Sequence, residues 1–179
     1  ALPGQAGVTF TYDSKLEQFV PDTTPDGVFT AGRANGVYDR AARIDDGRRA
    51  GLAAARSLGL RGDAPPDVSR NGVDARSHSY PIFQHPGKKN FIDFDEDLHL
   101  VDLANAHHEG YDSSELLKRY STVGMGPSQG KLANMNSVRV LAKLNGKSID
   151  ETGSTTSRPF ANPVSIGHLA GRRFHPMRH

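Results

Sequence analysis

The stretch Lys118–Lys131, KRYSTVGMGPSQGK, lies between two segments that have the apolar spacing of helices. Its glycines, Gly124, Gly126 and Gly130, lack Cβ atoms, so an anion can approach the backbone amides closely. A helix that begins directly after such a loop adds partial positive charge at its N-terminus. The stretch therefore predicts a phosphate or anionic-cofactor site. A connector of glycine and proline between two helices is the alternative, and composition alone favours that alternative.

The segments around this stretch predict a small helical domain. Apolar spacing and capping patterns indicate helices over residues 98–109, 112–120 and 129–144, and a short one from residue 148. Asp112 as N-cap and Glu115 at N3 would form a capping box for the second helix. Ser148 and Glu151 have the same spacing and would cap the fourth. Phe91–Phe94 is a possible strand before the first helix.

The N-terminal part has the pattern of a β–α unit. Residues 8–12, VTFTY, predict a strand that pairs with residues 15–20. The apolar run Gly27–Ala31 predicts a buried strand, and an alanine-rich helix should follow over Asp45–Leu58, with Asp45 or Asp46 as N-cap. A strand, a glycine turn and a helix in this order are typical of a dinucleotide-binding unit. The fingerprint G-x-G-x-x-G is absent, and a purely structural turn explains the pattern equally well.

The distribution of turn residues divides the chain into four parts. Residues 60–84 are rich in turn dipeptides and lack periodicity, apart from a possible short strand at Tyr80–Phe83. We expect a dinucleotide-binding part over residues 1–62, a linker over 63–90, a small helical domain over 91–152 and an extended interface tail over 153–179. The tail is basic but has scattered apolar residues, so it is expected to lie along another domain or another polypeptide of a complex.

The charges are sorted along the chain although the net charge is only +2. Residues 91–115 contain eight acidic residues and no Lys or Arg, whereas residues 116–149 contain six basic residues and no acid. A basic face of this kind favours an anionic ligand or an acidic partner. Nucleic acid is disfavoured as a partner, because no aromatic platform or reader motif accompanies the basic residues. No membrane span is expected, since no apolar run approaches about 18 residues.

Several kinds of catalytic or metal site are excluded or disfavoured. The absence of cysteine excludes disulfides, thiolate zinc sites and cysteine-ligated iron–sulfur clusters. His107 and His108 are adjacent, which is poor geometry for sharing one ion on a helix. The acidic residues at 93–97 lack the glycine and final glutamate of a calcium loop, so a solvated acidic turn or a cluster at the N-terminus of a helix is expected there. No G-x-S-x-G elbow is present.

A combination of motifs resembles the α subunit of bacterial heterotetrameric sarcosine oxidase. The motifs are GVFTAGRANGVYDRAARIDDGRRAG, FIDFDEDL, ELLKRYSTVGMGPSQGK, TTSRPF and HLAGRRFHP. The resemblance covers nearly the whole chain and is weakest over residues 60–74. It implies a middle piece of a longer polypeptide: an α/β fragment from the C-terminal part of an FAD/NAD(P)-binding Rossmann-like domain, then a small α-helical domain of the [2Fe-2S]-ferredoxin type without its cluster, and the extended basic tail.

For the N-terminal part, the resemblance implies a dinucleotide site. Val28–Gly59 is similar to the last strand and helix of a two-dinucleotide-domain flavoprotein fold. The family motif there has an aspartate that holds the ribityl chain of FAD, and Arg33 stands in its place. The resemblance therefore implies NAD in this pocket, not used for hydride transfer, rather than FAD. The implied contact residues are Ala31, Gly32, Arg33, Asn35 and Gly36.

For the helical part, the resemblance implies a flavin at an interface between subunits. Phe91–Leu144 is similar to the bacterioferritin-associated-ferredoxin domain, whose four cysteines are replaced here by Asp93, Asp95, Ser128 and about Ala133. No cluster can be held by such a set. In this family FMN lies between the α and β subunits, attached to β, and the basic stretch is inferred to face it. The implied contact residues are Lys118, Arg119, Ser121, Thr122, Gly124, Met125, Gly126, Ser128, Gln129 and Lys131.

The implied activity is the oxidative demethylation of sarcosine to glycine, with peroxide and methylene-tetrahydrofolate as the other products. FAD, FMN, NAD and tetrahydrofolate would serve the complete complex, whose β, γ and δ subunits are the expected partners, in the cytoplasm. The segment has no candidate general base or nucleophile, so no activity is expected from it alone. Two alternatives remain open: a subunit of a related amino-acid or opine oxidase, and a non-catalytic anion-binding module.

Overall fold

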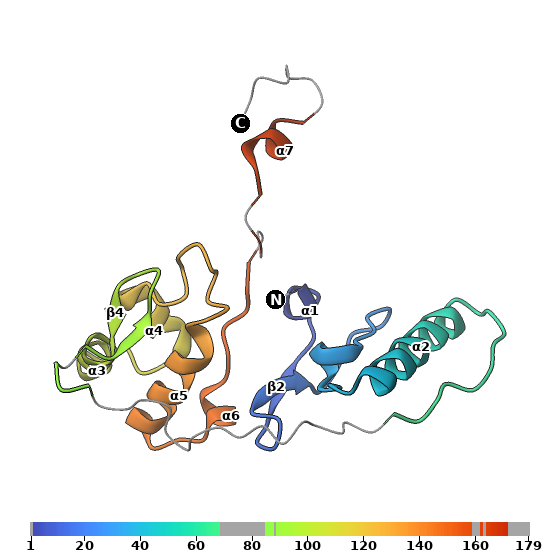
Figure 1. The fold of residues 1–179 in the computed structure, drawn as a ribbon, viewed down its shortest axis with the longest axis horizontal. Coiled ribbons are helices and arrows are strands. Elements are labelled where there is room, and N and C mark those ends of the chain that lie inside the picture. The colour runs from blue at the N-terminus through green and yellow to red at the C-terminus, as the bar shows by residue number, and fades with distance from the viewer. Residues whose placement is uncertain (1, 69–84, 88, 159–161, 163, 172–179) are drawn as a thin grey trace. The chain divides into compact units, whose positions relative to one another are not determined.

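The structure is a computed structural model that describes residues 2–68, 85–87, 89–158, 162 and 164–171. The chain forms two compact units (Figure 1). Of the described residues, the N-terminal unit contains 2–68 and 148–153, and the C-terminal unit contains those between 85 and 147 and those between 154 and 171. The possible strand at Tyr80–Phe83 lies outside the described residues. None of the described helices is long and apolar enough to cross a membrane.

The N-terminal unit is built on a β-hairpin. Strands β1 (Phe10–Asp13) and β2 (Gln18–Pro21) pair antiparallel, with Thr11 opposite Val20, which confirms the predicted pairing. The other elements of residues 2–68 are the short helix α1 (Leu2–Gln5), the 3₁₀ helix η1 (Gly32–Asn35) and the long helix α2 (Arg40–Ser57). Buried apolar residues join them: Val8, Leu16, Val20, Val37 and Ala50.

Two predictions for this unit are wrong. Helix α2 begins at Arg40 rather than at Asp45, because the carboxylate of Asp39 accepts a 2.9 Å hydrogen bond from the amide of Ala42 and caps the helix. Gly27–Ala31 is not a strand: Ala31 has extended backbone angles, but the strand pairs of the described chain are confined to two hairpins, neither of which includes this run. A strand requires a neighbour that satisfies its amides and carbonyls.

The C-terminal unit packs three helices beside a second hairpin (Figure 1). Strand β3 (Phe91–Asp93) pairs antiparallel with β4 (Leu98–His99), and helices α3 (Leu100–His108), α4 (Ser114–Ser121) and α5 (Asn134–Asn145) follow. Fully buried side chains from all three helices form the core, namely Leu103, Leu117, Val140 and Leu141. These three helices were predicted from their apolar spacing. The spacing reflects the side chains that each helix buries against the others.

The helix boundaries in this unit differ from the expected ones for local reasons. Helix α4 is capped by Ser113, whose hydroxyl accepts from the amide of Leu116, and not by Asp112. Helix α5 begins five residues later than expected. Gln129 and Gly130 have φ angles of 53° and 72°, which a right-handed helix cannot include. Helix α3 begins at Leu100 because Leu98 and His99 belong to strand β4.

Helix α6 (Ile149–Thr152) returns the chain to the N-terminal unit. Its predicted capping box is confirmed: the amide of Glu151 donates to the hydroxyl of Ser148, and the amide of Ser148 donates 2.8 Å to Oε2 of Glu151. The Oδ1 atom of Asp150 accepts a 2.6 Å hydrogen bond from the amide of Tyr12 on strand β1. Among the residues after 153 that the structure describes, Ile166–Ala170 form one short helix, α7.

Candidate functional site

The connection between helices α4 and α5, residues 122–133, is called the glycine loop below. It begins at Thr122, which caps α4 in the left-handed conformation at φ 65°. Such an angle is unfavourable for a β-branched residue. The hydroxyl of Thr122 donates a 2.9 Å hydrogen bond to Oε2 of Glu96. A side chain from the β3–β4 hairpin therefore stabilises the first residue of the loop.

Two more carboxylates of the same hairpin bind amides of the glycine loop. Oδ2 of Asp93 accepts from the amide of Gly124 at 2.7 Å, and Oδ2 of Asp95 accepts from the amide of Ser128 at 2.9 Å. Asp93, Asp95 and Glu96 are called the hairpin carboxylates below. The expectation of a solvated acidic turn is wrong for Asp93, which is only 2% exposed.

The hydrogen bonds to Ser128 also affect the ionisation of Asp95. The side chain of Ser128, and then its amide, hold the pKa of the Asp95 carboxyl below its usual value, and partial desolvation opposes them only weakly. The charged carboxylate is thus the form that binds the loop. Hydrogen bonds of this charge-assisted kind are stronger than those between neutral groups.

The glycines of the loop are buried and serve close packing. A Cβ atom at Gly126 would lie 2.5 Å from Cβ of Asp95, and one at Gly124 or Gly130 would collide with the side chain of Asn134. The expectation that these glycines uncover amides for an external anion is therefore wrong for Gly124, whose amide is taken by Asp93. Glycine is required here because the hairpin and helix α5 approach the loop backbone.

A cationic pocket lies beside the loop, within the C-terminal unit. Its volume is about 380 Å³, and it is lined by Glu115, Lys118, Arg119, Gly124, Met125, Gln129, Thr156, Ser157 and Arg158. Three cations and one carboxylate face a space that also offers two hydroxyl groups and a glutamine amide. Arginine and lysine side chains of this kind bind phosphate and carboxylate groups.

The pocket brings together part of the predicted set and adds four residues. Five of the predicted contact residues line the pocket, namely Lys118, Arg119, Gly124, Met125 and Gln129. Glu115, Thr156, Ser157 and Arg158 were not in that set. The last three belong to the TTSRPF motif, which supported the resemblance but had been given no contact role. A motif some 30 residues away becomes part of a site only through the path of the tail.

The remaining predicted residues of the stretch lie outside the lining of the pocket. Ser121 is buried, and its hydroxyl donates 2.7 Å to the carbonyl of Leu117. Lys131 directs its ammonium group to Oδ1 of Asn162 at 2.5 Å. Thr122 and Ser128 bind the hairpin carboxylates. A cofactor contact for these residues stays a prediction, as it does for Gly126.

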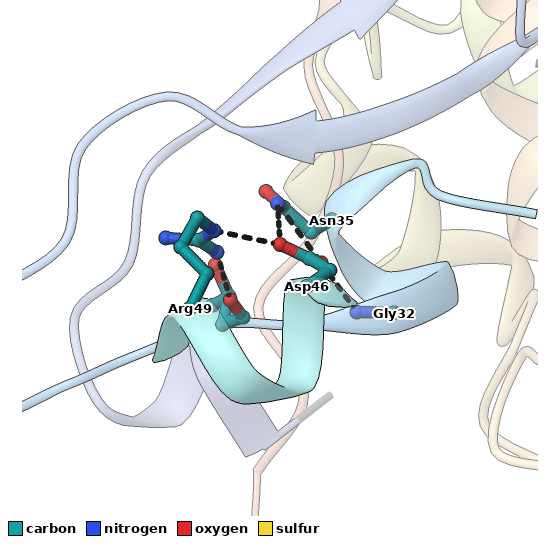
Figure 2. Close-up of polar contacts among 5 residues, drawn as sticks. Gly32, Asn35, Asp46 and Arg49 are labelled. Atoms are coloured by element: carbon teal, nitrogen blue, oxygen red, sulfur yellow. Dashed lines mark hydrogen bonds and ion pairs between the residues drawn. The ribbon is translucent and has the colours of Figure 1, made fainter. Parts of the chain in front are cut away.

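Two of the predicted dinucleotide residues, Gly32 and Asn35, bind a buried carboxylate of the N-terminal unit (Figure 2). Asp46 is 0% exposed and accepts hydrogen bonds from the amide of Gly32 at 2.7 Å, from the side-chain amide of Asn35 and from Nε of Arg49 at 2.7 Å. Arg49 also donates 2.9 Å to the carbonyl of Thr30. Asp46, expected as a possible helix cap, instead fixes η1 against helix α2.

The ionisation of Asp46 follows from this network. Burial alone would raise the pKa of the Asp46 carboxyl, but hydrogen bonds from Arg49, Gly32 and Asn35, together with the charge of Arg49, outweigh burial and hold the pKa below its usual value. The buried group is therefore a paired anion. A buried charge persists only when partners of this kind compensate for lost hydration.

Three of the five predicted dinucleotide residues have structural roles. Gly32 and Asn35 bind Asp46, and Gly36, at φ 79°, is buried so closely that a Cβ atom would lie 2.7 Å from Cδ1 of Leu16. Arg33 is exposed, and Ala31 is half-buried at the N-cap of η1. The structure brings the five residues together on one turn, and their contact with a dinucleotide stays a prediction.

Comparison with known proteins adds a family and a fold. Residues 87–172 match the family of the Sarcosine oxidase A3 domain. The chain is 39% identical over 158 residues to the alpha subunit of sarcosine oxidase from Rhizobium meliloti (strain 1021), covering 85% of this chain and 16% of that relative. It is 26% identical to the A subunit of opine oxidase from the same organism, covering 80% of this chain and 34% of that relative. The chain thus spans well under half the length of these relatives.

A solved structure shares the fold. The crystal structure of L-proline dehydrogenase from P. horikoshii matches 93% of this chain and 36% of its own chain, with a TM-score of 0.69 and 20% sequence identity. At this identity the likeness concerns the fold. It shows that the succession of a hairpin, a long helix and a small helical unit also occurs as part of a larger protein.

Proposed function

We propose that the chain is a section of the α subunit of an oxidoreductase complex, because residues 87–172 match the Sarcosine oxidase A3 domain family. The proposed reaction of the complex is the oxidative demethylation of sarcosine. The similarity of this chain to the alpha subunit of a sarcosine oxidase over 85% of its length supports this proposal. The complete complex would use FAD, FMN, NAD and tetrahydrofolate and would release glycine, peroxide and methylene-tetrahydrofolate. The β, γ and δ subunits would be its partners.

The cationic pocket is the observation that carries the cofactor part of this proposal. Lys118, Arg119 and Arg158 line a volume of about 380 Å³ beside the glycine loop. Their charges suit the phosphate of FMN and any negative charge that the flavin ring acquires on reduction. Met125 is 52% exposed beside them and offers an apolar surface to a ring. Bound FMN would supply the electron transfer, and this chain would supply binding and charge.

The N-terminal unit is proposed to contribute dinucleotide contacts. The network of Asp46 holds the turn of Gly32 and Asn35 rigidly, and the exposed side chain of Arg33 stands beside it. A positive side chain at this position suits the phosphates of NAD better than the neutral ribityl chain of FAD. FAD and tetrahydrofolate would bind elsewhere in the complex.

Calorimetric titration with FMN and with NAD tests the proposal, on a complete complex prepared without cofactors and with a β subunit that cannot form the bond to FMN, so that FMN binds reversibly. We expect wild-type complex to bind both, and Arg119→Ala together with Arg158→Ala to weaken FMN binding while leaving NAD binding unchanged. Lys147→Ala is the matched control, because Lys147 is an exposed cation of the same unit that does not line the pocket. Binding of FMN that does not change in the double variant would exclude the pocket as its site.

The similarity to one subunit of an opine oxidase supports a second candidate. In that case the same unit would serve a complex that oxidises other N-alkyl amino acids. Assays of the complete complex with sarcosine and with opines distinguish the two, since the better substrate identifies the enzyme. If neither substrate is oxidised and neither cofactor binds, the results favour the third alternative, a non-catalytic anion-binding module.

A further inference from the structure

The hairpin carboxylates bind the glycine loop at three separate points. Glu96 accepts from the hydroxyl of Thr122, Asp93 accepts from the amide of Gly124, and Asp95 accepts from the amide of Ser128. Met125 and Gln129, which line the pocket, lie next to two of these points along the chain. The three bonds therefore restrain the segment from which one wall of the pocket is built.

The backbone of this segment includes two unfavourable conformations. Thr122 and Gln129 have φ angles of 65° and 53°, a region that residues other than glycine rarely occupy. Such conformations persist where the surroundings determine them. The bond of Glu96 acts on Thr122 itself, and the bond of Asp95 acts on the residue before Gln129.

We propose that Asp93, Asp95 and Glu96 are positioning residues for the cationic pocket. By binding the glycine loop, they fix Met125 and Gln129 in the wall of the pocket. The binding of an anion therefore depends on three nearby carboxylates. This inference rests on the proposed function in so far as the bound anion is the phosphate of a flavin. It also assigns recognition of that phosphate to the side chains of Lys118, Arg119 and Arg158, because the hairpin carboxylates occupy amides of the loop.

When a hairpin carboxylate is removed, the proposal predicts a change in anion affinity opposite to the change that charge alone would cause. Removing a carboxylate near a cationic pocket should strengthen the binding of an anion if charge alone matters. Removing a carboxylate that shapes the pocket should weaken it. Asp97 is the matched control: it lies on the same turn, its side chain is 88% exposed, and its carboxylate faces His99, at 3.8 Å, rather than the loop.

The experiment uses the complete α chain in its assembled complex, prepared without flavin and with a β subunit that cannot form the bond to FMN, so that FMN binds reversibly. Asp95→Ala, Asp95→Asn and Asp97→Ala are compared with wild type. Dissociation constants for FMN and for inorganic phosphate are measured by calorimetry, and hydrogen exchange is measured on a peptide that covers residues 122–133. Asp95→Asn keeps an acceptor oxygen for the amide of Ser128, so it serves as the conservative rescue.

We expect Asp95→Ala to weaken FMN binding about tenfold and to speed exchange at Ser128 by a similar factor, as the loss of a charge-assisted hydrogen bond implies. Asp95→Asn should restore most of both properties, and Asp97→Ala should tighten binding or leave it unchanged. Unchanged exchange in Asp95→Ala, or faster exchange with FMN binding as tight as in wild type, would overturn this inference alone. Failure of wild type to bind either probe would overturn it together with the proposed function.

Discussion

The amide of Gly32 donates a 2.7 Å hydrogen bond to Oδ2 of Asp46, fourteen positions later in the chain. This bond joins the N-terminal end of the 3₁₀ helix η1 to the inner face of helix α2 (Figure 2). The same carboxylate binds Asn35 and Arg49, so that one buried side chain organises the turn on which the dinucleotide proposal depends. Its removal should therefore affect the N-terminal unit more than the loss of any exposed charge.

Asp46→Ala should lower the free energy of unfolding by about 3 kcal/mol, because it leaves the guanidinium of Arg49 and the amide of Gly32 without their buried acceptor. Denaturant unfolding followed by circular dichroism measures the change. Asp45→Ala is the control, since Asp45 is the preceding residue on the same helix and is exposed. Equal effects of the two variants would show that the network adds nothing to stability.

Stability should fall in acid for an identified reason. Hydrogen bonds hold the pKa of Asp46 and of Asp95 below the usual value in the folded state. The unfolded carboxyls have pKa values of about 3.9, so their contribution is complete above that pH and is lost as pH falls through the lower folded values. Unfolding midpoints at pH 6, 4 and 3 test this prediction. The unfolding midpoint of Asp46→Asn should depend less on pH than that of wild type, because the asparagine side chain does not ionise.

Gly126→Ala should destabilise the C-terminal unit by about 1–3 kcal/mol, because the new Cβ atom would meet Cβ of Asp95 at 2.5 Å and Oε1 of Glu96 at 2.8 Å. Displacement of these two carboxylates should also weaken FMN binding. Thermal unfolding and calorimetry of the complete complex provide the two measurements. A variant as stable as wild type, with unaltered affinity, would contradict the close packing of loop and hairpin.

Gly47→Ala should stabilise the chain by about 0.5–1 kcal/mol, since Gly47 lies inside helix α2 and a Cβ atom there meets nothing within 4 Å. Gly32→Ala is the variant to compare with Gly47→Ala. A Cβ atom at Gly32 also meets nothing within 4 Å, but its φ of 69° makes alanine unfavourable. Opposite shifts in the melting temperatures of the two variants are expected. Shifts of the same sign would contradict the backbone assignment.

Charge in the pocket should control flavin affinity. Arg158→Ala and Arg119→Ala should each raise the dissociation constant of FMN by roughly five- to tenfold, as the loss of one hydrogen bond to a charged group implies. Lys131→Ala should have a smaller effect, because the ammonium group of Lys131 binds Asn162 and does not line the pocket. A larger effect for Lys131 than for Arg158 would place the phosphate elsewhere on the loop.

Local patterns predicted much of the secondary structure. The hairpin of β1 and β2, the helices α3 to α5 and the capping box of Ser148 and Glu151 follow from alternation, apolar spacing and hydroxyl–carboxylate spacing. Boundaries were less predictable. Asp45 and Asp46 were the expected caps of helix α2, but Asp39, which the sequence pattern did not single out, caps it in the structure.

The site was predictable only where the glycine-rich stretch itself supplies the lining, as it does with Lys118, Arg119 and Gln129. Arg158 joins them through the path of the tail, which the sequence does not reveal. The roles of the hairpin carboxylates depended on pairing over about 30 residues, which one sequence does not reveal. The available signal was the cluster of acidic residues at the end of the predicted strand Phe91–Phe94 and directly after it.

Helix α6 has a consequence for how this protein can be divided. Residues 148–153 belong to the N-terminal unit, while the residues on both sides of them belong to the other. The backbone therefore passes between the units three times, and neither unit is one uninterrupted stretch of gene. A fragment that stops before residue 148 would lack the carboxylate of Asp150 that receives the amide of Tyr12. A single crossover in the gene therefore cannot exchange either unit as a whole.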